Sequence, residues 1–193
     1  MRPARMILAA GLLALLVPAR AEPPPPPDAA LFDGAGYRTA RYRSPVAADP
    51  APARAIALAD ALALHAKGAA LFIDVMPAEG GLRDPATGAW RLVEDHLTIP
   101  DALWFPEAGR APVDPVLWRA LEAGVRAERR AAPHRPVILF CRIDCWMSWN
   151  AARRLATAGF GEVFWLAEGT DGWHDAGRPL VVAEPVAVPA PAR

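Results

Sequence analysis

The sequence predicts an α/β domain with a mainly parallel central sheet flanked by helices, and two observations indicate this fold class. Residues 69–75, 137–140 and 162–166 are short, mainly apolar runs, which are typical of strands buried on both faces. Segments with apolar residues at helical spacing alternate with these runs. Strands that alternate with helices favour a parallel sheet with helices packed on its faces.

The predicted helices are bounded by capping or breaking residues. Residues 55–67 carry alanine and leucine at helical spacing, and Gly68 stands where a helix would end. Asp114 and Pro115 supply an N-cap and a proline at the first helical position, for a helix that continues to about residue 130. The remaining expectations are helices over residues 148–159 and 170–177, a long loop over 76–95 and a short strand or turn over 97–106.

The two ends of the chain have the composition of segments outside a domain. Residues 1–21 combine a positive start, an apolar run and small residues at the end, which is the pattern of a secretory signal peptide. The apolar run is too short for a membrane span, which needs about 20 residues. Residues 22–31 form a proline-rich spacer, residues 32–185 the single domain, and residues 186–193 a flexible tail. We therefore expect an exported, periplasmic protein without a membrane span.

The charge balance excludes some classes of partner. The full sequence has 21 lysine and arginine residues and 21 aspartate and glutamate residues. Removing the predicted signal peptide also removes its arginines and leaves the mature chain weakly acidic. Nothing in this balance points to nucleic acid or to an anionic membrane surface as a partner.

The candidate site is the stretch "FCRIDCWMSWN", which holds the only two cysteines of the chain, Cys141 and Cys145. Cys141 directly follows the clearest predicted strand, at the edge of a parallel sheet where ligands bind. A helix N-terminus and loop amides would stabilise its thiolate. A disulfide between the pair closes so small a ring that it would stabilise the fold by only about 2 kcal/mol. A redox pair, a metal-binding clip and a nucleophile with a bystander all remain open.

Several segments follow, in order and spacing, the pattern of the rhodanese-like domain: "LFIDV", "TIPDALWFP", "VILFCRIDCW", "NAARRLATAGFGEVFWLAEGTDGW" and "AGRPL". Together with "FDGAGYR" near the start, the tryptophan-rich cysteine loop resembles the exported CXXCW-motif family associated with pyrroloquinoline quinone (PQQ)-dependent alcohol catabolism, although the spacing here is C-x3-C-W. The resemblance implies a single rhodanese-like domain with Cys141 at the active position. It also implies, as a partner, a periplasmic PQQ-dependent dehydrogenase system or its electron carrier.

The cysteine loop departs from the sulfurtransferase pattern. A working rhodanese loop is expected to hold an anion such as thiosulfate, whereas Asp144 repels anions and tryptophans crowd the loop. A rhodanese-fold phosphatase needs an arginine where this chain has Met147, which excludes that activity. We therefore expect thiol–disulfide or persulfide chemistry with Cys141 as the attacking thiolate and Cys145 as the resolving thiol. The expected substrate-binding or cofactor-binding residues are Arg142, Asp144, Trp146, Met147, Ser148, Trp149 and Trp173.

Three alternatives stay open beside this interpretation. The pair could bind Cu(I), a soft ion that prefers sulfur ligands, with Met147 adjacent and His174 the best-placed histidine. No complete metal-ligand set is predicted, since two cysteines and one histidine fall short of a zinc site. Tryptophans around the loop could instead stack on a redox cofactor such as a quinone in a non-catalytic binding module. The third alternative is a thiosulfate-type sulfurtransferase.

The other polar candidates are expected to be structural. Asp74 should hydrogen-bond to neighbouring loops, and the basic, aromatic residues 37–43 should pack over the domain edge. Glu168 and Asp171 are expected to cap the short helix that follows. His65 is expected to be an ordinary surface residue.

Overall fold

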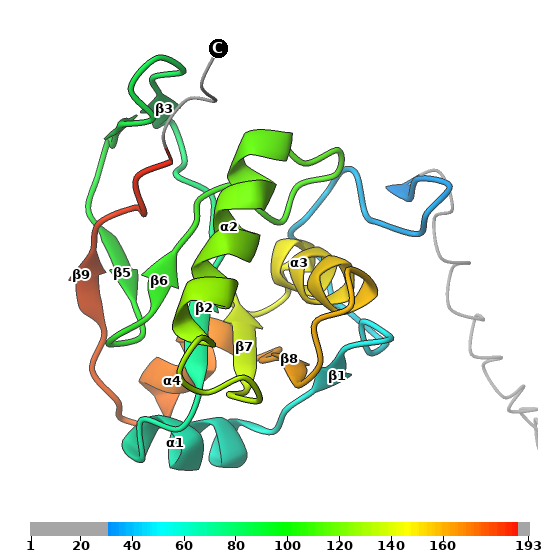
Figure 1. Ribbon diagram of the computed structural model, residues 1–193, viewed down its shortest axis with the longest axis vertical. Coiled ribbons are helices and arrows are strands. Elements are labelled where there is room, and N and C mark those ends of the chain that lie inside the picture. Colours follow the sequence, from blue (N-terminus) through cyan, green and yellow to red (C-terminus); the bar gives the residue numbers. More distant parts are fainter. Residues whose placement is uncertain (1–30, 189–193) are drawn as a thin grey trace, which may run out of the picture.

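The computed structural model of the 193-residue chain describes residues 31–188 (Figure 1). The predicted signal peptide, the spacer up to residue 30 and residues 189–193 of the predicted tail lie outside the described residues. Within residues 31–188, no helix has both the length and the apolar composition needed to cross a membrane.

A parallel sheet forms the centre of the fold. Its strands follow the order β1 (Arg54–Ala55), β8 (Val163–Trp165), β7 (Val137–Phe140), β2 (Leu71–Asp74) and β6 (Leu103–Trp104). Every pair of neighbouring strands in it is parallel. All residues of β2 and β7 are buried, as their unbroken apolar runs predicted. The α/β class with a mainly parallel central sheet is therefore confirmed.

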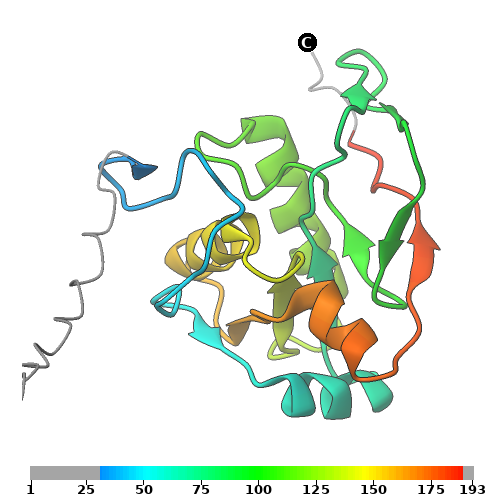
Figure 2. The same cartoon turned by 180° about the vertical axis from the view of Figure 1, so that it is seen from behind.

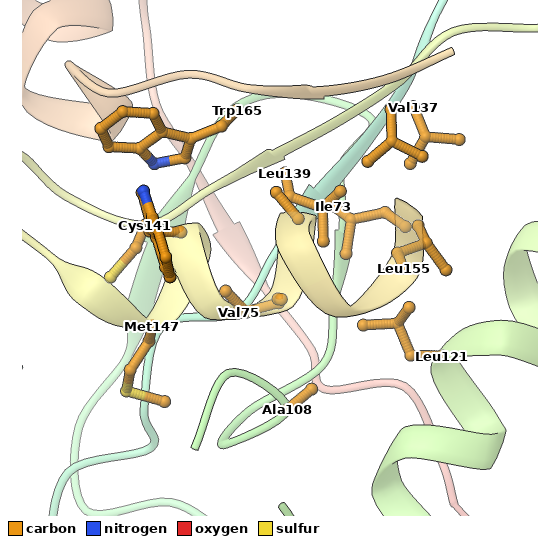
Figure 3. Close-up of a cluster of buried hydrophobic side chains, with 14 of the residues drawn as sticks. Ile73, Val75, Ala108, Leu121, Val137, Leu139, Cys141, Met147, Leu155 and Trp165 are labelled. Carbon is orange, nitrogen blue, oxygen red and sulfur yellow. The ribbon is translucent and has the colours of Figure 1, made fainter. Parts of the chain in front are cut away.

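Two helices cover each face of this sheet. Figure 1 shows α2 (Pro115–Glu128) and α3 (Trp146–Thr157) on one face, and Figure 2 shows α1 (Leu58–Ala66) and α4 (Gly169–Asp175) on the other. Successive side chains of a strand point to opposite faces, so each strand contributes to two cores. The α2–α3 core contains Leu71, Ile73, Val137, Leu139 and Leu155 (Figure 3), and the α1–α4 core contains Ala61, Phe72, Ile138, Phe140 and Trp173.

The helix boundaries differ slightly from the predicted ones, for local reasons. The first helix begins at Leu58 rather than residue 55, because Arg54–Ala55 pairs with β8 as strand β1. The predicted N-cap of α2 is confirmed, since the Asp114 side chain accepts a hydrogen bond from Val116 N at 2.7 Å. Helix α3 begins two residues earlier than predicted, which transfers Trp146 and Met147 from the loop to the helix.

Two small antiparallel sheets accompany the central one. Strands β3 (Leu82–Arg83) and β4 (Trp90–Arg91) pair within the segment predicted to be a long loop, so that prediction was incomplete. Strand β5 (His96–Thr98) pairs with β9 (Val181–Ala183), which brings the C-terminal segment beside residues far away in the sequence.

The edge strand β6 is covered by the chain's own C-terminal segment. Trp104 forms a parallel bridge with Pro185, and Val186 N donates a hydrogen bond to Trp104 O at 2.9 Å. Val188 is buried as well. The packed chain therefore extends at least three residues beyond the predicted end of the domain at residue 185.

Candidate functional site

The two cysteines form a disulfide at the carboxyl edge of the central sheet. Cys141 directly follows β7, and Cys145 occupies the N-cap position of α3, with 6.2 Å between their Cα atoms. Only 0% of Cys141 and 3% of Cys145 is exposed, so both sulfurs are almost completely shielded from solvent. The helix N-terminus that the sequence analysis gave to Cys141 thus belongs to Cys145.

The loop between the cysteines is held from one side by the start of α4. Thr170 N donates to Cys141 O at 2.9 Å, and Ile143 N donates to Asp171 Oδ2 at 2.7 Å. Asp144 has a φ of 55°, a left-handed conformation that aspartate tolerates better than most residues. The prediction that Asp171 and Glu168 cap α4 was wrong: Asp171 binds the cysteine loop, and Glu168 makes no side-chain capping bond.

From the other side the loop is covered by residues 37–46, which we call the strap. Ser44 N donates to Asp144 O at 2.9 Å, Trp146 N donates to Tyr42 O at 2.8 Å, and Arg43 Nη1 donates to Ile143 O at 3.0 Å. The expected packing of residues 37–43 over the domain edge is confirmed, and the covered part is the cysteine loop itself.

Asn150 on α3 fastens the strap. Its side chain is fully buried, accepts a hydrogen bond from Arg38 N at 3.0 Å, and donates to Arg38 O at 2.8 Å and Gly109 O at 3.0 Å. The Arg38 guanidinium lies 4.9 Å from the ring centroid of Trp146. One amide thus connects the strap, the 105–114 connection and α3. Sequence reasoning missed Asn150, because a single asparagine in a helix carries no pattern.

A second cation–aromatic contact holds the beginning of the strap. The Arg154 guanidinium lies 4.5 Å from the ring centroid of Tyr37 and 5.1 Å from that of Trp118. Burial lowers the pKa of Arg154 from its usual value, although the pKa of an arginine is so high that the side chain stays cationic. The Arg154 side chain therefore packs under the strap.

Two backbone amides of the cysteine loop are committed to the protein itself. An anion cradle of the rhodanese type needs loop N–H groups that point at the ligand. Here Ile143 N is used by Asp171, and Trp146 N is used by Tyr42. Together with the Asp144 carboxylate, this leaves a poor site for an anion such as thiosulfate.

The predicted site residues on α3 lie close to the disulfide, but they are packed rather than open. Trp146, Met147, Ser148 and Trp149 are all buried in the first turn of the helix. Ser148 Oγ donates to Cys145 O at 3.1 Å, and Trp165 Nε1 donates to Ser148 Oγ at 3.0 Å. Trp165, drawn with Cys141 in Figure 3, belongs to the same cluster. Trp165 was one of the tryptophans expected near the loop, although it was not among the predicted binding residues.

Trp173 is not brought to the cysteine loop. It lies in the core on the opposite face of the sheet, where its ring packs against His65 and Phe72 with centroid distances of 4.8 and 6.1 Å. His65 is consequently not an ordinary surface residue. Its Nε2 atom is 2.9 Å from Pro100 O, and its ring fills the space between α1 and Trp173.

Arg142 turns away from the disulfide toward a second polar site. Its guanidinium pairs with Glu79 at 2.8 Å and lines a cavity of about 250 Å³ together with Met76, His96 and Trp104. Beside this cavity the fully buried Asp74 accepts hydrogen bonds from Met76 N, His96 Nε2 and Thr98 Oγ1, which confirms the expected structural bonding.

The residues weighed as metal ligands are not assembled. The His174 side chain is 75% exposed and pairs only with Asp175. Within the described part of the chain, no group of three or more histidine, cysteine, aspartate or glutamate side chains is arranged to hold a metal ion. The sulfurs of Cys141 and Cys145, being bonded to each other, are not available as thiolate ligands in this state.

Comparison with known proteins gives only distant structural likenesses. No protein-family model matches the chain, and no curated protein matches it. Among solved structures, a thiosulfate sulfurtransferase from Pseudomonas aeruginosa matches with a TM-score of 0.45 and 20% identity over 69% of this chain. The match spans 21% of that protein's chain. A likeness at this level bears on neither activity nor site residues. The structure itself shows a mainly parallel α/β sheet with a cysteine directly after its central strand β7.

Proposed function

We propose that this chain is a rhodanese-like accessory protein whose Cys141–Cys145 pair cycles between disulfide and dithiol by thiol–disulfide exchange. The observation that carries the proposal is the bond between a cysteine at a strand end and a cysteine at a helix N-cap, inside one short loop. Both positions lie at the carboxyl edge of the sheet, where α/β folds place their chemistry.

A purely structural purpose explains this disulfide poorly. In the chain-entropy account, closing a loop of five residues stabilises the fold by about 2 kcal/mol, less than a bridge between distant segments would contribute. The loop is already held from both sides by hydrogen bonds from the strap and from the start of α4. A cross-link therefore adds little rigidity here, which favours a chemical use.

The exchange reaction balances with two donor thiols. A donor thiolate attacks one sulfur, the Cys141–Cys145 bond breaks, and a mixed disulfide forms while the other cysteine leaves as a thiolate. A second donor thiolate attacks the donor sulfur of the mixed disulfide and releases the remaining cysteine. The protein gains two electrons and two protons as a dithiol, and the donors are oxidised to one disulfide.

The helix position assigns the roles of the two cysteines. The N-terminus of the 12-residue helix α3 stabilises negative charge, and Cys145 stands at its N-cap. We therefore assign Cys145 as the cysteine that carries the mixed disulfide, is released as a thiolate in the second step and is the nucleophile of the reverse reaction. Cys141, fully buried after β7, becomes the resolving cysteine. This exchanges the roles that the sequence analysis expected.

The cellular setting in the proposal comes from the sequence resemblance alone. An exported protein of this kind would act in the periplasm, beside a PQQ-dependent dehydrogenase system or its electron carrier. Sulfur transfer through a persulfide, Cu(I) binding and binding of a redox cofactor are the competing functions that the first experiment must separate.

The proposal is tested on purified full-length protein and on the variants Cys141→Ser and Cys145→Ser. Glutathione redox buffers followed by mass spectrometry should interconvert a disulfide and a dithiol form reversibly, and Cys145 in the first variant should be alkylated at lower pH than Cys141 in the second. A stable gain of one sulfur from thiosulfate favours the sulfurtransferase instead. Stoichiometric copper in anaerobically purified protein, lost in both variants, favours the metal site.

A further inference from the structure

A small cavity opens directly beside the disulfide loop. It has a volume of about 170 Å³ and is lined by Val46, Ile143, Asp144, Trp165, Ala167 and Glu168. Ile143 and Asp144 lie between the two cysteines in sequence, and Val46 ends the strap. Trp165 is the last residue of β8, and Ala167 and Glu168 lie just after it. Anything bound in this cavity therefore touches the cysteine loop.

Both charged residues of the lining are acidic. Among residues 31–188, no side chain pairs with the Asp144 carboxylate. Glu168 Oε2 is buried and has no hydrogen-bond partner in the same range. The nearby cation Arg43 is not part of the lining, because its guanidinium donates to the Ile143 carbonyl. The cavity thus combines two carboxylates with no cation to neutralise them.

The remaining walls are apolar and partly open. Val46, Trp165 and Ala167 present hydrocarbon surface, and Ile143 at the loop tip is 46% exposed. Lysine and arginine side chains combine an apolar stem with a charged head, and they bury the stem along apolar surface while the head finds its partner. A volume of about 170 Å³ accepts one such side chain. Ile143, exposed beside the cavity, can contact the protein surface around the inserted lysine or arginine.

We infer that this cavity receives a lysine or arginine side chain of a partner protein, placed next to the partner's reactive cysteine. This inference rests on the proposed thiol–disulfide function and names its substrate class: protein thiols in a basic context. The carboxylates hold the partner's cation beside the shielded disulfide, and the partner's thiolate attacks when local opening of the strap exposes a sulfur. The same charges disfavour anionic thiols and anionic sulfur donors.

The test compares thiols that differ in charge. Reduction of the Cys141–Cys145 bond is followed with the peptides Gly-Lys-Cys-Gly and Gly-Glu-Cys-Gly, both blocked at their termini, and with cysteamine and 3-mercaptopropionate. Each rate constant is calculated per thiolate. It is then divided by the rate constant of the same thiol with a small neutral disulfide, hydroxyethyl disulfide, which corrects for intrinsic reactivity. The lysine peptide should be about tenfold faster than the glutamate peptide at low salt, and the ratio should fall as salt screens the charges.

Variants locate the effect in the cavity. The double substitution Asp144→Asn and Glu168→Gln keeps shape, and asparagine tolerates the left-handed backbone at position 144. In this double variant the normalised rate of the lysine peptide should be close to that of the glutamate peptide, so that their ratio approaches 1. Asp175→Asn is the matched control, because Asp175 is 84% exposed and does not line the cavity.

The outcomes separate this inference from the function beneath it. Equal rates for the two peptides, or a ratio that the double variant leaves unchanged, overturn the cation subsite while leaving thiol–disulfide exchange intact. Discrimination among the small thiols without discrimination between the peptides overturns the protein partner. If no thiol reduces the bond in the folded protein, the proposed function and the inference fail together.

Discussion

The substitution Asn150→Ala tests whether the strap controls access to the disulfide. The buried amide makes three hydrogen bonds, two with the Arg38 backbone and one with Gly109 O. At about 1 kcal/mol for each bond, the free energy of unfolding should fall by about 3 kcal/mol. Two of the three bonds hold the strap, so if the released strap lifts from the cysteine loop, the open form becomes up to about 30-fold more populated, since 1.4 kcal/mol corresponds to tenfold.

Two measurements check the Asn150 prediction. Urea unfolding gives the change in stability, and the rate of disulfide reduction by dithiothreitol under native conditions gives the change in access. Asn150→Asp keeps the acceptor for Arg38 N but removes both donated bonds, so it should also be destabilising. A loss of stability below about 1 kcal/mol, or an unchanged reduction rate in a destabilised Asn150→Ala protein, refutes the reasoning that the strap limits access.

Three further predictions follow from the same structure. Replacing both cysteines with alanine should lower the free energy of unfolding by about 2 kcal/mol in urea titrations, and a loss above about 4 kcal/mol would make the bond a structural staple after all. Asp74→Asn turns one of the two carboxylate oxygens into a donor, which then faces either Met76 N or the pair His96 Nε2 and Thr98 Oγ1, and should cost about 2 kcal/mol in the same assay. Thr98→Val, which removes one of these bonds, should cost about 1 kcal/mol. The Ala86 amide lowers the pKa of Asp84 below its usual 3.8, so the stability that this turn contributes is present above that pH and is lost as the pH falls through the lowered pKa. An NMR titration of the Asp84 carboxyl checks the direction, and a midpoint at or above 3.8 contradicts it.

The sequence predicted the central elements well because their signals are local. The apolar runs of β2 and β7 and the Asp114 cap of α2 depend only on neighbouring residues. The surroundings of the cysteines depend on long-range packing. The strap binds the loop mainly through backbone groups, and the Arg38–Trp146 contact joins residues 108 positions apart, which no periodicity reveals.

The two tryptophans illustrate the same limit. Trp165 and Trp173 both lie in segments expected near the loop, yet they lie on opposite faces of the sheet. The register Leu139↔Trp165 puts Trp165 on the face of Leu139 and Cys141, whereas Trp173 on α4 packs against Phe72. Strand register and helix placement decide this, and neither can be obtained from the composition of the segments.

The covered edge at β6 has a consequence for how the molecule behaves in a crowded compartment. An open sheet edge offers unpaired N–H and C=O groups to a strand from another molecule, which is a common route to aggregation. Here β1 is only two residues long, and Pro185 and Val186 of the same chain occupy the side of Trp104. Pro185 and Val186 therefore block the β6 edge and prevent a strand of another molecule from pairing with it. A chain shortened after Ala183 should self-associate, and light scattering of that truncated protein against the full chain would detect it.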